Sequence, residues 1–326
     1  MYLSVIAFAL HLVVAVFCVL KLRLGLRQVD WSDEQRRRGT MNKAWLPFYR
    51  PPASLLPSRV RMYFRAFVFA PFQLYLIVIL HVIVLVNISI MSDLATALRI
   101  PVSLLLEWVM GFKVTQSGQR EECACIVGNH VSAFDIYALL LITSHSPAVA
   151  GQTPKCTAFL AKSETIKMPI IGRVAARLGS VFVDRQNQDK RFAVISSVET
   201  KLKNWNSHEA QLAIFPEGTT TNQTFLLPFK SSTLQFPGVK YQPLRIQYSQ
   251  PHNSLTFSTT LTHLIFALCL DASELKMTWL PVVTGGPGSA EKLRLAISND
   301  GNFSFTDDAS FRAHREMTIF AERNLK

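Results

Sequence analysis

The distribution of apolar residues divides the chain into two parts. Residues 2–20 are almost wholly apolar, and residues 66–91 form a second apolar block. Each block is close to the about 20 residues that a helix needs to cross a bilayer. Residues 98–112 are apolar but shorter, and they include Arg99 and Glu107, which suits an interfacial or core helix better. The pattern therefore predicts membrane-embedded helices in the N-terminal part of the chain.

From about residue 120 the pattern changes, and short apolar runs alternate with longer stretches of mixed polarity. The apolar runs predict strands over residues 123–127, 157–161, 180–183, 211–215, 241–248 and 277–283. The longer stretches predict helices over residues 134–143, 170–178 and 190–205. Thr306, Asp307 and Asp308 predict the N-terminal cap of a last helix that runs to Arg323. This alternation is typical of an α/β domain, a mixed sheet flanked by helices.

The segment between the two long apolar blocks is strongly basic. Residues 21–65 contain eleven Lys and Arg but only three Asp and Glu. Such a segment is typical of a cytosolic loop that follows the positive-inside rule, or of a patch that binds anionic lipid headgroups. A cleaved signal peptide would instead place its charge before the apolar run and small residues after it. We therefore expect a membrane anchor over residues 1–95, an α/β domain over 96–290 and a helical tail over 291–326.

The overall composition supports a membrane partner. The chain has 326 residues, of which 49% are hydrophobic and 17% charged, against the about 25% charged residues of soluble domains. The mean hydropathy is +0.22. The net charge of +12 predicts an anionic partner, for which membrane and nucleic acid both qualify. The apolar bias favours membrane lipids, and no zinc-finger spacing or basic zipper accompanies the charge, so we expect no nucleic-acid binding.

A histidine and a carboxylate follow the strand predicted over residues 123–127. His130 and Asp135 come directly after Gly128, where this strand would open into a helix. A neutral imidazole can take a proton from an alcohol, and a carboxylate can hold the imidazole in the required tautomer. The two side chains would not meet on a regular helix, so we expect a turn over residues 130–133 that folds Asp135 back toward His130.

Two further stretches carry candidate chemistry. The strand over residues 179–185 ends in Arg185, a side chain suited to bidentate binding of phosphate. Phe215-Pro216-Glu217-Gly218-Thr219 predicts a turn after another strand, in which glycine lets a ligand approach the backbone. The carboxyl of Glu217 and the hydroxyl of Thr219 can bind the hydroxyl groups of a ligand.

The three stretches, in this order, resemble the motifs of the glycerolipid acyltransferases, the family of the lysophospholipid acyltransferases. The resemblance covers roughly residues 95–290, and its first motif is matched by Asn129, His130, Ser132 and Asp135. Further matches to the family are Ala161, Lys162, Pro169, Gly172 and Pro243. Thr220-Thr221-Asn222 after the Glu-Gly-Thr turn, with Phe229-Lys230, looks closest to the lysophosphatidylcholine and lysophosphatidylethanolamine acyltransferases. Enzymes that act on lysophosphatidic acid typically have Arg at the position of Thr220, and this chain departs from its branch at Ser231-Ser232, where a Pro-Gly pair is usual.

The resemblance implies transfer of an acyl group from acyl-CoA to the free hydroxyl of a lysophospholipid, with lysophosphatidylcholine or lysophosphatidylethanolamine preferred over lysophosphatidic acid. His130 and Asp135 would be catalytic, and Asn129 and Ser132 would support them. The substrate-binding residues would be Arg185, Glu217, Gly218, Thr219 and Lys230. Acyl-CoA is a co-substrate, and we expect no other cofactor and no metal. The resemblance also implies the endoplasmic reticulum membrane, or lipid droplets as an alternative location. We expect a cytosolic active site, because acyl-CoA is cytosolic.

Several alternatives remain open from the sequence. A non-catalytic acyltransferase-like scaffold and a membrane-bound hydrolase that uses His130 with water are the rival functions. Ser132 as a nucleophile is disfavoured, because the chain has no Gly-x-Ser-x-Gly elbow. The second apolar block can span the membrane fully or form a re-entrant hairpin. Asn222 and Asn302 lie in Asn-x-Ser/Thr sequons, so glycosylation at either would indicate a lumenal site.

Overall fold

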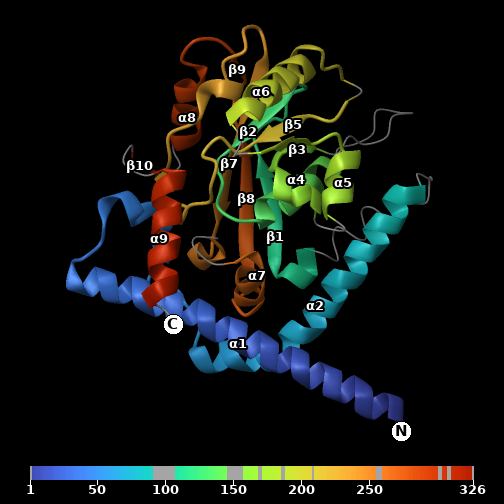
Figure 1. Ribbon diagram of the computed structural model, residues 1–326, viewed down its shortest axis with the longest axis vertical. Coiled ribbons are helices and arrows are strands. Elements are labelled where there is room, and N and C mark those ends of the chain that lie inside the picture. Colours follow the sequence, from blue (N-terminus) through green and yellow to red (C-terminus); the bar gives the residue numbers. More distant parts are fainter. Residues whose placement is uncertain are drawn as a thin grey trace.

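The computed structural model describes residues 2–90, 107–144, 157–167, 171–184, 188–207, 209–254, 259–299, 303–306 and 310–324. Several positions of the sequence analysis lie outside these ranges: Arg185, Pro169, Asn302, Asp307, Asp308 and most of residues 98–112. The described part contains a central sheet, helices on both of its faces and two long N-terminal helices (Figure 1).

The central sheet is mixed and has eight strands, in the order β1-β8-β7-β2-β5-β3-β4, with β9 paired to β7. Its strands are β1 (Phe112–Ser117), β2 (Cys125–Gly128), β3 (Ala158–Lys162), β4 (Val181–Val183), β5 (Leu212–Ile214), β7 (Lys240–Tyr248), β8 (Ser273–Trp279) and β9 (Val283–Thr284). From β7 to β4 all neighbours are parallel, whereas β8 is antiparallel to β7. A separate parallel pair is formed by β6 (Phe225–Leu226) and β10 (Ser304–Phe305). The predicted α/β fold with a mixed sheet is confirmed.

Helices cover both faces of the sheet. The α-helices are α1 (Tyr2–Arg38), α2 (Arg59–Ile90), α4 (Phe134–Ser144), α5 (Ile171–Arg177), α6 (Gln188–Lys203), α7 (Thr260–Leu268), α8 (Ser289–Ser298) and α9 (Phe311–Asn324). The 3-10 helices are η1 (Lys43–Phe48), η2 (Ala53–Leu55), η3 (Ser163–Lys167), η4 (Ser231–Thr233) and η5 (Pro251–Asn253). In β2, Cys125 and Val127 belong to the core under α6 and α8, and Ile126 to the core under α4 and α7. This alternation follows from the two-residue period of a strand and places all of β2 in the interior.

The N-terminal helices correct one expectation. α1 does not end near residue 20 but continues to Arg38, so the first part of the expected basic loop is helical. Arg, Leu, Gln and Glu are strong helix formers, and an ion pair between Arg38 and Glu34, four residues apart, supports the last turn. α2 begins at Arg59, before the predicted block, and Pro71 lies inside it without ending it. Two segments, Ile6–Arg38 and Arg59–Leu80, are long and apolar enough to cross a membrane.

Both N-terminal helices pack on the sheet domain. Figure 1 shows α1 across the lower end of the molecule, with α2 rising beside it and α9 standing on its other half. A Cβ atom at Gly25 of α1 would lie only 2.5 Å from the ring of Phe266 in α7, so this glycine permits close packing of the two helices. The side chain of Gln73 in α2 donates to the carbonyl of Val109, just ahead of β1 (2.9 Å). The anchor therefore shares a core with the domain that it precedes.

The C-terminal part differs from the predicted boundaries. The strand expected over residues 277–283 begins earlier, at Ser273, and ends at Trp279, because Pro281 has no N–H for the ladder. Residue 290 falls inside α8, whose Leu293 and Ile297 lie in the core of the sheet domain, so a separate tail does not begin there. α9 packs on η1 through an aromatic cluster of Trp31, Trp45, Phe48, His314 and Phe320. β1 and α7 were not predicted.

Candidate active site

The His130–Asp135 pair lies between the end of β2 and the first turn of α4. His130 Nδ1 is 2.8 Å from Asp135 Oδ2, which confirms the contact and the turn that the sequence predicts. Because a carboxylate only accepts hydrogen bonds, Nδ1 carries the ring proton and Nε2 is left as the proton acceptor. The His130 side chain is 19% exposed, whereas that of Asp135 is fully buried. The pair thus has the arrangement that a general base and its orienting carboxylate require.

Four donors surround the buried Asp135 carboxylate. Oδ2 accepts from the backbone N–H groups of Val131 (2.7 Å) and Ser132 (2.9 Å) in addition to the His130 ring. Oδ1 accepts from the hydroxyl of Tyr248 (2.7 Å). These bonds offset the water that the carboxylate loses on burial and fix the plane of its oxygens.

The His130 ring and backbone are held by the loop that follows β5. The ring stacks on Phe215, with ring centroids 4.4 Å apart and planes 17° from parallel. The His130 carbonyl accepts from the Thr221 N–H (3.0 Å), and its N–H donates to Glu217 Oε1 (2.8 Å). The structure therefore brings the predicted first and third motifs together.

Glu217 is placed differently from its expected role. The side chain is buried, with Oε1 on the His130 N–H and Oε2 on the Leu227 N–H (3.0 Å). Burial is the main cause that raises the pKa of Glu217 to about 8, and the two backbone donors oppose this rise. The carboxyl therefore braces the backbone of the catalytic loop and is not presented to a ligand.

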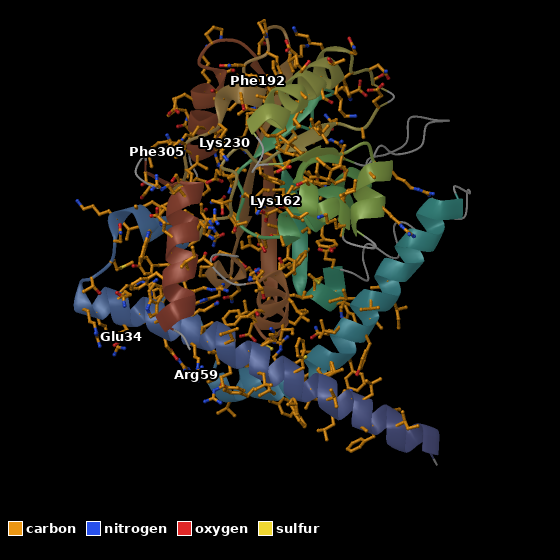
Figure 2. All side chains as sticks on the ribbon, viewed as in Figure 1. Glu34, Arg59, Lys162, Phe192, Lys230 and Phe305 are labelled. Carbon is orange, nitrogen blue, oxygen red and sulfur yellow. The ribbon has the colours of Figure 1, made fainter. Side chains whose placement is uncertain are left out.

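The other predicted substrate-binding residues lie around this turn or outside the described ranges. Gly218 has φ of 75°, the left-handed conformation that glycine adopts without strain. Thr219 follows it and is 8% exposed. Lys230 is exposed, and Figure 2 labels it over the upper part of the molecule. Arg185 is not among the described residues, so its phosphate-binding role stays a prediction.

The two supporting residues bind elements far away in the sequence. The Asn129 side chain donates to the carbonyl of Ile246 (3.0 Å) and accepts from its N–H (2.8 Å), which joins the catalytic loop to β7. Ser132 Oγ is 3.0 Å from His263 Nε2 and accepts from the Phe134 N–H (3.3 Å) at the start of α4. Ser132 is fully buried, in agreement with a structural role and not with that of a nucleophile.

Asn222, which lies in an Asn-x-Ser/Thr sequon, connects the turn to the N-terminal segment. Its Nδ2 donates to the carbonyls of Leu46 (2.9 Å) and Tyr49 (3.1 Å), and its N–H donates to Pro47 (2.7 Å). The side chain is 7% exposed. A glycan on Nδ2 would disrupt these contacts, so glycosylation at Asn222 is unsuitable as a test of topology in the folded protein.

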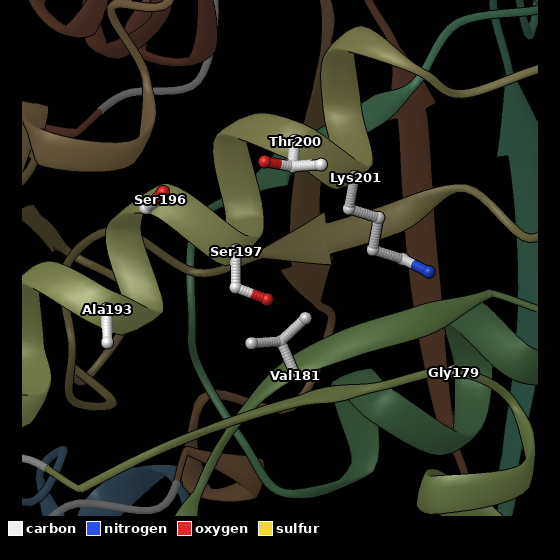
Figure 3. Close-up of a pocket in the computed structure, with 7 residues that line it drawn as sticks. All are labelled: Gly179, Val181, Ala193, Ser196, Ser197, Thr200 and Lys201. Carbon is white, nitrogen blue, oxygen red and sulfur yellow. The ribbon is translucent and has the colours of Figure 1, made fainter.

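A depression of about 710 Å³ lies elsewhere, between α6 and β4. Figure 3 shows Ser197 of α6 pointing toward Val181, whereas the side chain of Lys201 extends toward Gly179. It shares no residue with the loops that hold His130 and Asp135. We assign no chemistry to it.

The His/Asp pair at the end of β2 and the Glu-Gly-Thr turn joined to it lie in one part of the mixed-sheet domain. Residues 112–246 match the Acyltransferase family model, which spans β1 to β7 and includes all of these loops. The match covers less than half of the chain, and over these residues the chain is similar to that family.

Curated relatives support this placement. The chain is 29% identical over 197 residues to lysophospholipid acyltransferase LPEAT1 of Arabidopsis thaliana, a match that covers 57% of this chain and 46% of that protein. It is 31% identical over 180 residues to lysophosphatidylcholine acyltransferase 2 of Danio rerio, covering 53% of this chain and 31% of that protein. The matches therefore span less than half the length of these relatives.

One solved structure is similar in shape. It is the crystal structure of the 1-acyl-sn-glycerophosphate acyltransferase of Thermotoga maritima, with a TM-score of 0.47 and 21% identity. The superposition covers 79% of this chain and 93% of that chain.

Proposed function

We propose that the protein transfers an acyl group from acyl-CoA to the free hydroxyl of a lysophospholipid. The observation that carries the proposal is the His130–Asp135 pair, in which the carboxylate occupies Nδ1 and leaves Nε2 on a partly exposed ring edge. The curated relatives are named for lysophospholipid and lysophosphatidylcholine acyltransfer, which supports the substrate class. Among acceptors we propose a preference for lysophosphatidylcholine or lysophosphatidylethanolamine over lysophosphatidic acid, because Thr220 stands where the latter enzymes typically have Arg.

The chemistry needs one base and no enzyme nucleophile. His130 Nε2 takes the proton of the lipid hydroxyl while its oxygen attacks the thioester carbonyl carbon. The C–O bond forms, the C–S bond breaks, and the leaving CoA sulfur receives the proton from the imidazolium. Such proton transfer contributes a factor of about 10² to 10⁴ in rate. Asp135 holds the ring and stabilises the imidazolium between the two transfers.

Positive charges near the site would bind the phosphate groups of the substrates. We propose Arg185 for this role, with Lys230 as a second cation and Thr219 and the Gly218 backbone beside the acceptor lipid. Glu217 acts in the proposal through the His130 backbone and not through the substrate, since both of its oxygens face backbone N–H groups.

The decisive variant is His130→Ala in isolated membranes, assayed with labelled acyl-CoA and a panel of lysolipids. We expect loss of acyl transfer by at least about 10²-fold, with the variant still recovered in the membrane fraction. His314→Ala is the control, because His314 packs on Phe48 outside the catalytic loops. Activity of His130→Ala near that of the wild type would contradict the mechanism. Absence of transfer in the wild type would favour a scaffold, and release of fatty acid without a lysolipid would favour a hydrolase.

We further propose the endoplasmic reticulum membrane as the location, with the active site on the cytosolic side and lipid droplets as an alternative. Two features of the N-terminal helices support this topology. The exposed face of α1 changes from apolar at Leu20 to basic at Arg23 and Arg27, which suits a cytosolic membrane boundary. α2 is one continuous helix and forms no hairpin within residues 66–90, but Gln73 joins it to Val109, so α2 lies against the domain. A glycosylation acceptor appended to the C-terminus should stay unmodified, and its modification would exclude a cytosolic site.

A further inference from the structure

Tyr248, the last residue of β7, lies in none of the motifs that mark the site, yet it contacts the catalytic pair directly. We propose that Tyr248 is a positioning residue for acyl transfer, whose hydroxyl fixes the Asp135 carboxylate that orients His130. This inference rests on the proposed function. Its evidence is the hydrogen bond from the Tyr248 hydroxyl to Asp135 Oδ1, at 2.7 Å between two buried side chains.

The bonds of Asp135 divide between its two oxygens. Oδ2 serves the His130 ring and two backbone N–H groups, while Oδ1 accepts from Tyr248. A carboxylate held at one oxygen only can rotate about its Cβ–Cγ bond, whereas donors at both oxygens fix its plane. The Tyr248 hydroxyl therefore sets the direction from which Oδ2 meets His130 Nδ1.

The side chain of Gln223 forms hydrogen bonds with both the N–H and the carbonyl of Tyr248. Gln223 Nε2 donates to the Tyr248 carbonyl and the Tyr248 N–H donates to Gln223 Oε1, both at 2.9 Å. Gln223 has φ of 56°, a conformation that non-glycine residues seldom adopt. Gln223 thus links the loop after β5 to β7, and Tyr248 continues this link to Asp135.

The charged state of the surrounding groups suits this role. Burial raises the pKa of Tyr248 well above its usual value, so the hydroxyl stays protonated and donates over the whole pH range of an assay. From α7, burial lowers the pKa of His263 well below its usual value, so the ring that bonds Ser132 is neutral. Glu217 faces the His130 backbone, with Arg294 of α8 nearby, and Arg50 acts on His263.

Loss of the hydroxyl has two expected consequences. The carboxylate is less well oriented, which lowers kcat by about tenfold, a size typical of one lost hydrogen bond to a charged group. The negative charge also concentrates on Oδ2, which favours the protonated ring. The acid limb of the kcat/KM profile should therefore move to higher pH, by about half a unit. The KM values for acyl-CoA and lysolipid should change little, because Tyr248 is buried away from them.

Tyr248→Phe is the test, with Tyr241→Phe as its matched control. Tyr241 is an equally buried tyrosine of the same strand, and its hydroxyl donates to the Thr233 carbonyl (3.2 Å), outside the catalytic loops. We expect the control to keep the wild-type pH profile, whatever its effect on thermal stability. A Tyr248→Phe profile that coincides with that of the control would overturn the proposal, as would a rise in KM without a shift of the acid limb.

A second measurement separates positioning from folding. In the Asp135→Asn background, Tyr248→Phe should lower single-turnover rates little further, because its effect acts through the carboxylate. Additive losses would contradict the proposal. If Tyr248→Phe does not fold, Gln223→Met, which removes both hydrogen bonds to the Tyr248 backbone without adding a charge, should give a smaller shift in the same direction, and an unchanged profile would overturn the idea. These outcomes are distinct from a failure of the proposed function, in which case the wild-type protein itself would lack acyl transfer.

Discussion

Replacing Glu217 with glutamine distinguishes a carboxyl that binds the acceptor lipid from one that holds the catalytic loop. The side chains have nearly the same shape, so the change is chemical. In the structure both carboxyl oxygens receive a backbone N–H, from His130 and from Leu227. Glutamine offers one acceptor oxygen and one NH₂ group, so one backbone N–H must face another donor.

The expected magnitude follows from this single mismatch. A buried donor that loses its acceptor costs about 1–3 kcal/mol, and the free energy of unfolding measured at about pH 4.5 should fall by that amount. When the glutamine amide keeps its oxygen on the His130 N–H, the Leu227 N–H loses its acceptor. When the amide is flipped, the His130 N–H loses its acceptor instead. Partial occupancy of the second orientation should lower kcat by about three- to tenfold, with the KM for lysolipid within about twofold of the wild type.

The assay is acyl transfer over a range of lysolipid concentrations, combined with thermal or denaturant unfolding of the purified protein. Glu209→Gln is the control, because Glu209 is an exposed carboxyl whose contact is with the Asn206 side chain. A large rise in the KM for lysolipid, with kcat and stability unchanged, would refute the reasoning and return Glu217 to the substrate.

Two further predictions concern stability. Burial raises the pKa of Glu217 from 4.5 to about 8, so the folded protein keeps a proton there that the unfolded chain releases. The stability contributed by Glu217 is therefore complete below about pH 4.5 and lost as the pH rises to about 8. Denaturant titrations should show that the difference in unfolding free energy between the wild type and Glu217→Gln shrinks across this window. A difference that grows with pH would contradict the assignment. Gly25→Ala should lower the melting temperature, because the about 1–3 kcal/mol of overpacking against Phe266, whose ring lies 2.5 Å from the new Cβ, exceeds the about 1 kcal/mol gained in helix propensity. A raised melting temperature would show that α1 does not pack on α7 in this way.

The local features of the site were predictable because they depend on short stretches of sequence. The apolar run before Gly128 predicted a buried strand, and the spacing of His130 and Asp135 required a turn that the structure contains. Ser132 as a supporting residue is also consistent with its burial. His130 and Asp135 are only five residues apart, so local secondary structure alone decides whether they meet.

The remaining contacts depend on strand order, which the sequence pattern does not reveal. Tyr248 reaches Asp135 because β7 pairs with β2 in a register that places Leu244 opposite Gly128. Tyr248 and Asp135 are 113 residues apart in the sequence. The backbone partners of Glu217 could not be predicted for the same reason, since the N–H groups of His130 and Leu227 carry no sequence signal. β1 escaped prediction because its apolar-polar alternation ends after Val114 and is followed by three polar residues, Thr115, Gln116 and Ser117.

The anchor is part of the structure that positions the catalytic base. Asn222 binds the carbonyls of Leu46 and Tyr49 in the segment that links α1 to α2, and the same loop bonds the His130 carbonyl through the Thr221 N–H. Leu227, whose N–H binds Glu217, packs in one cluster with Trp31 of α1. A flexible tether would let the domain sit at any height above the bilayer. Here the helices with exposed apolar faces and the loop that carries His130 are joined by buried hydrogen bonds and a shared core. If α1 and α2 enter a membrane, the depth at which they do so therefore sets the distance between the membrane surface and His130.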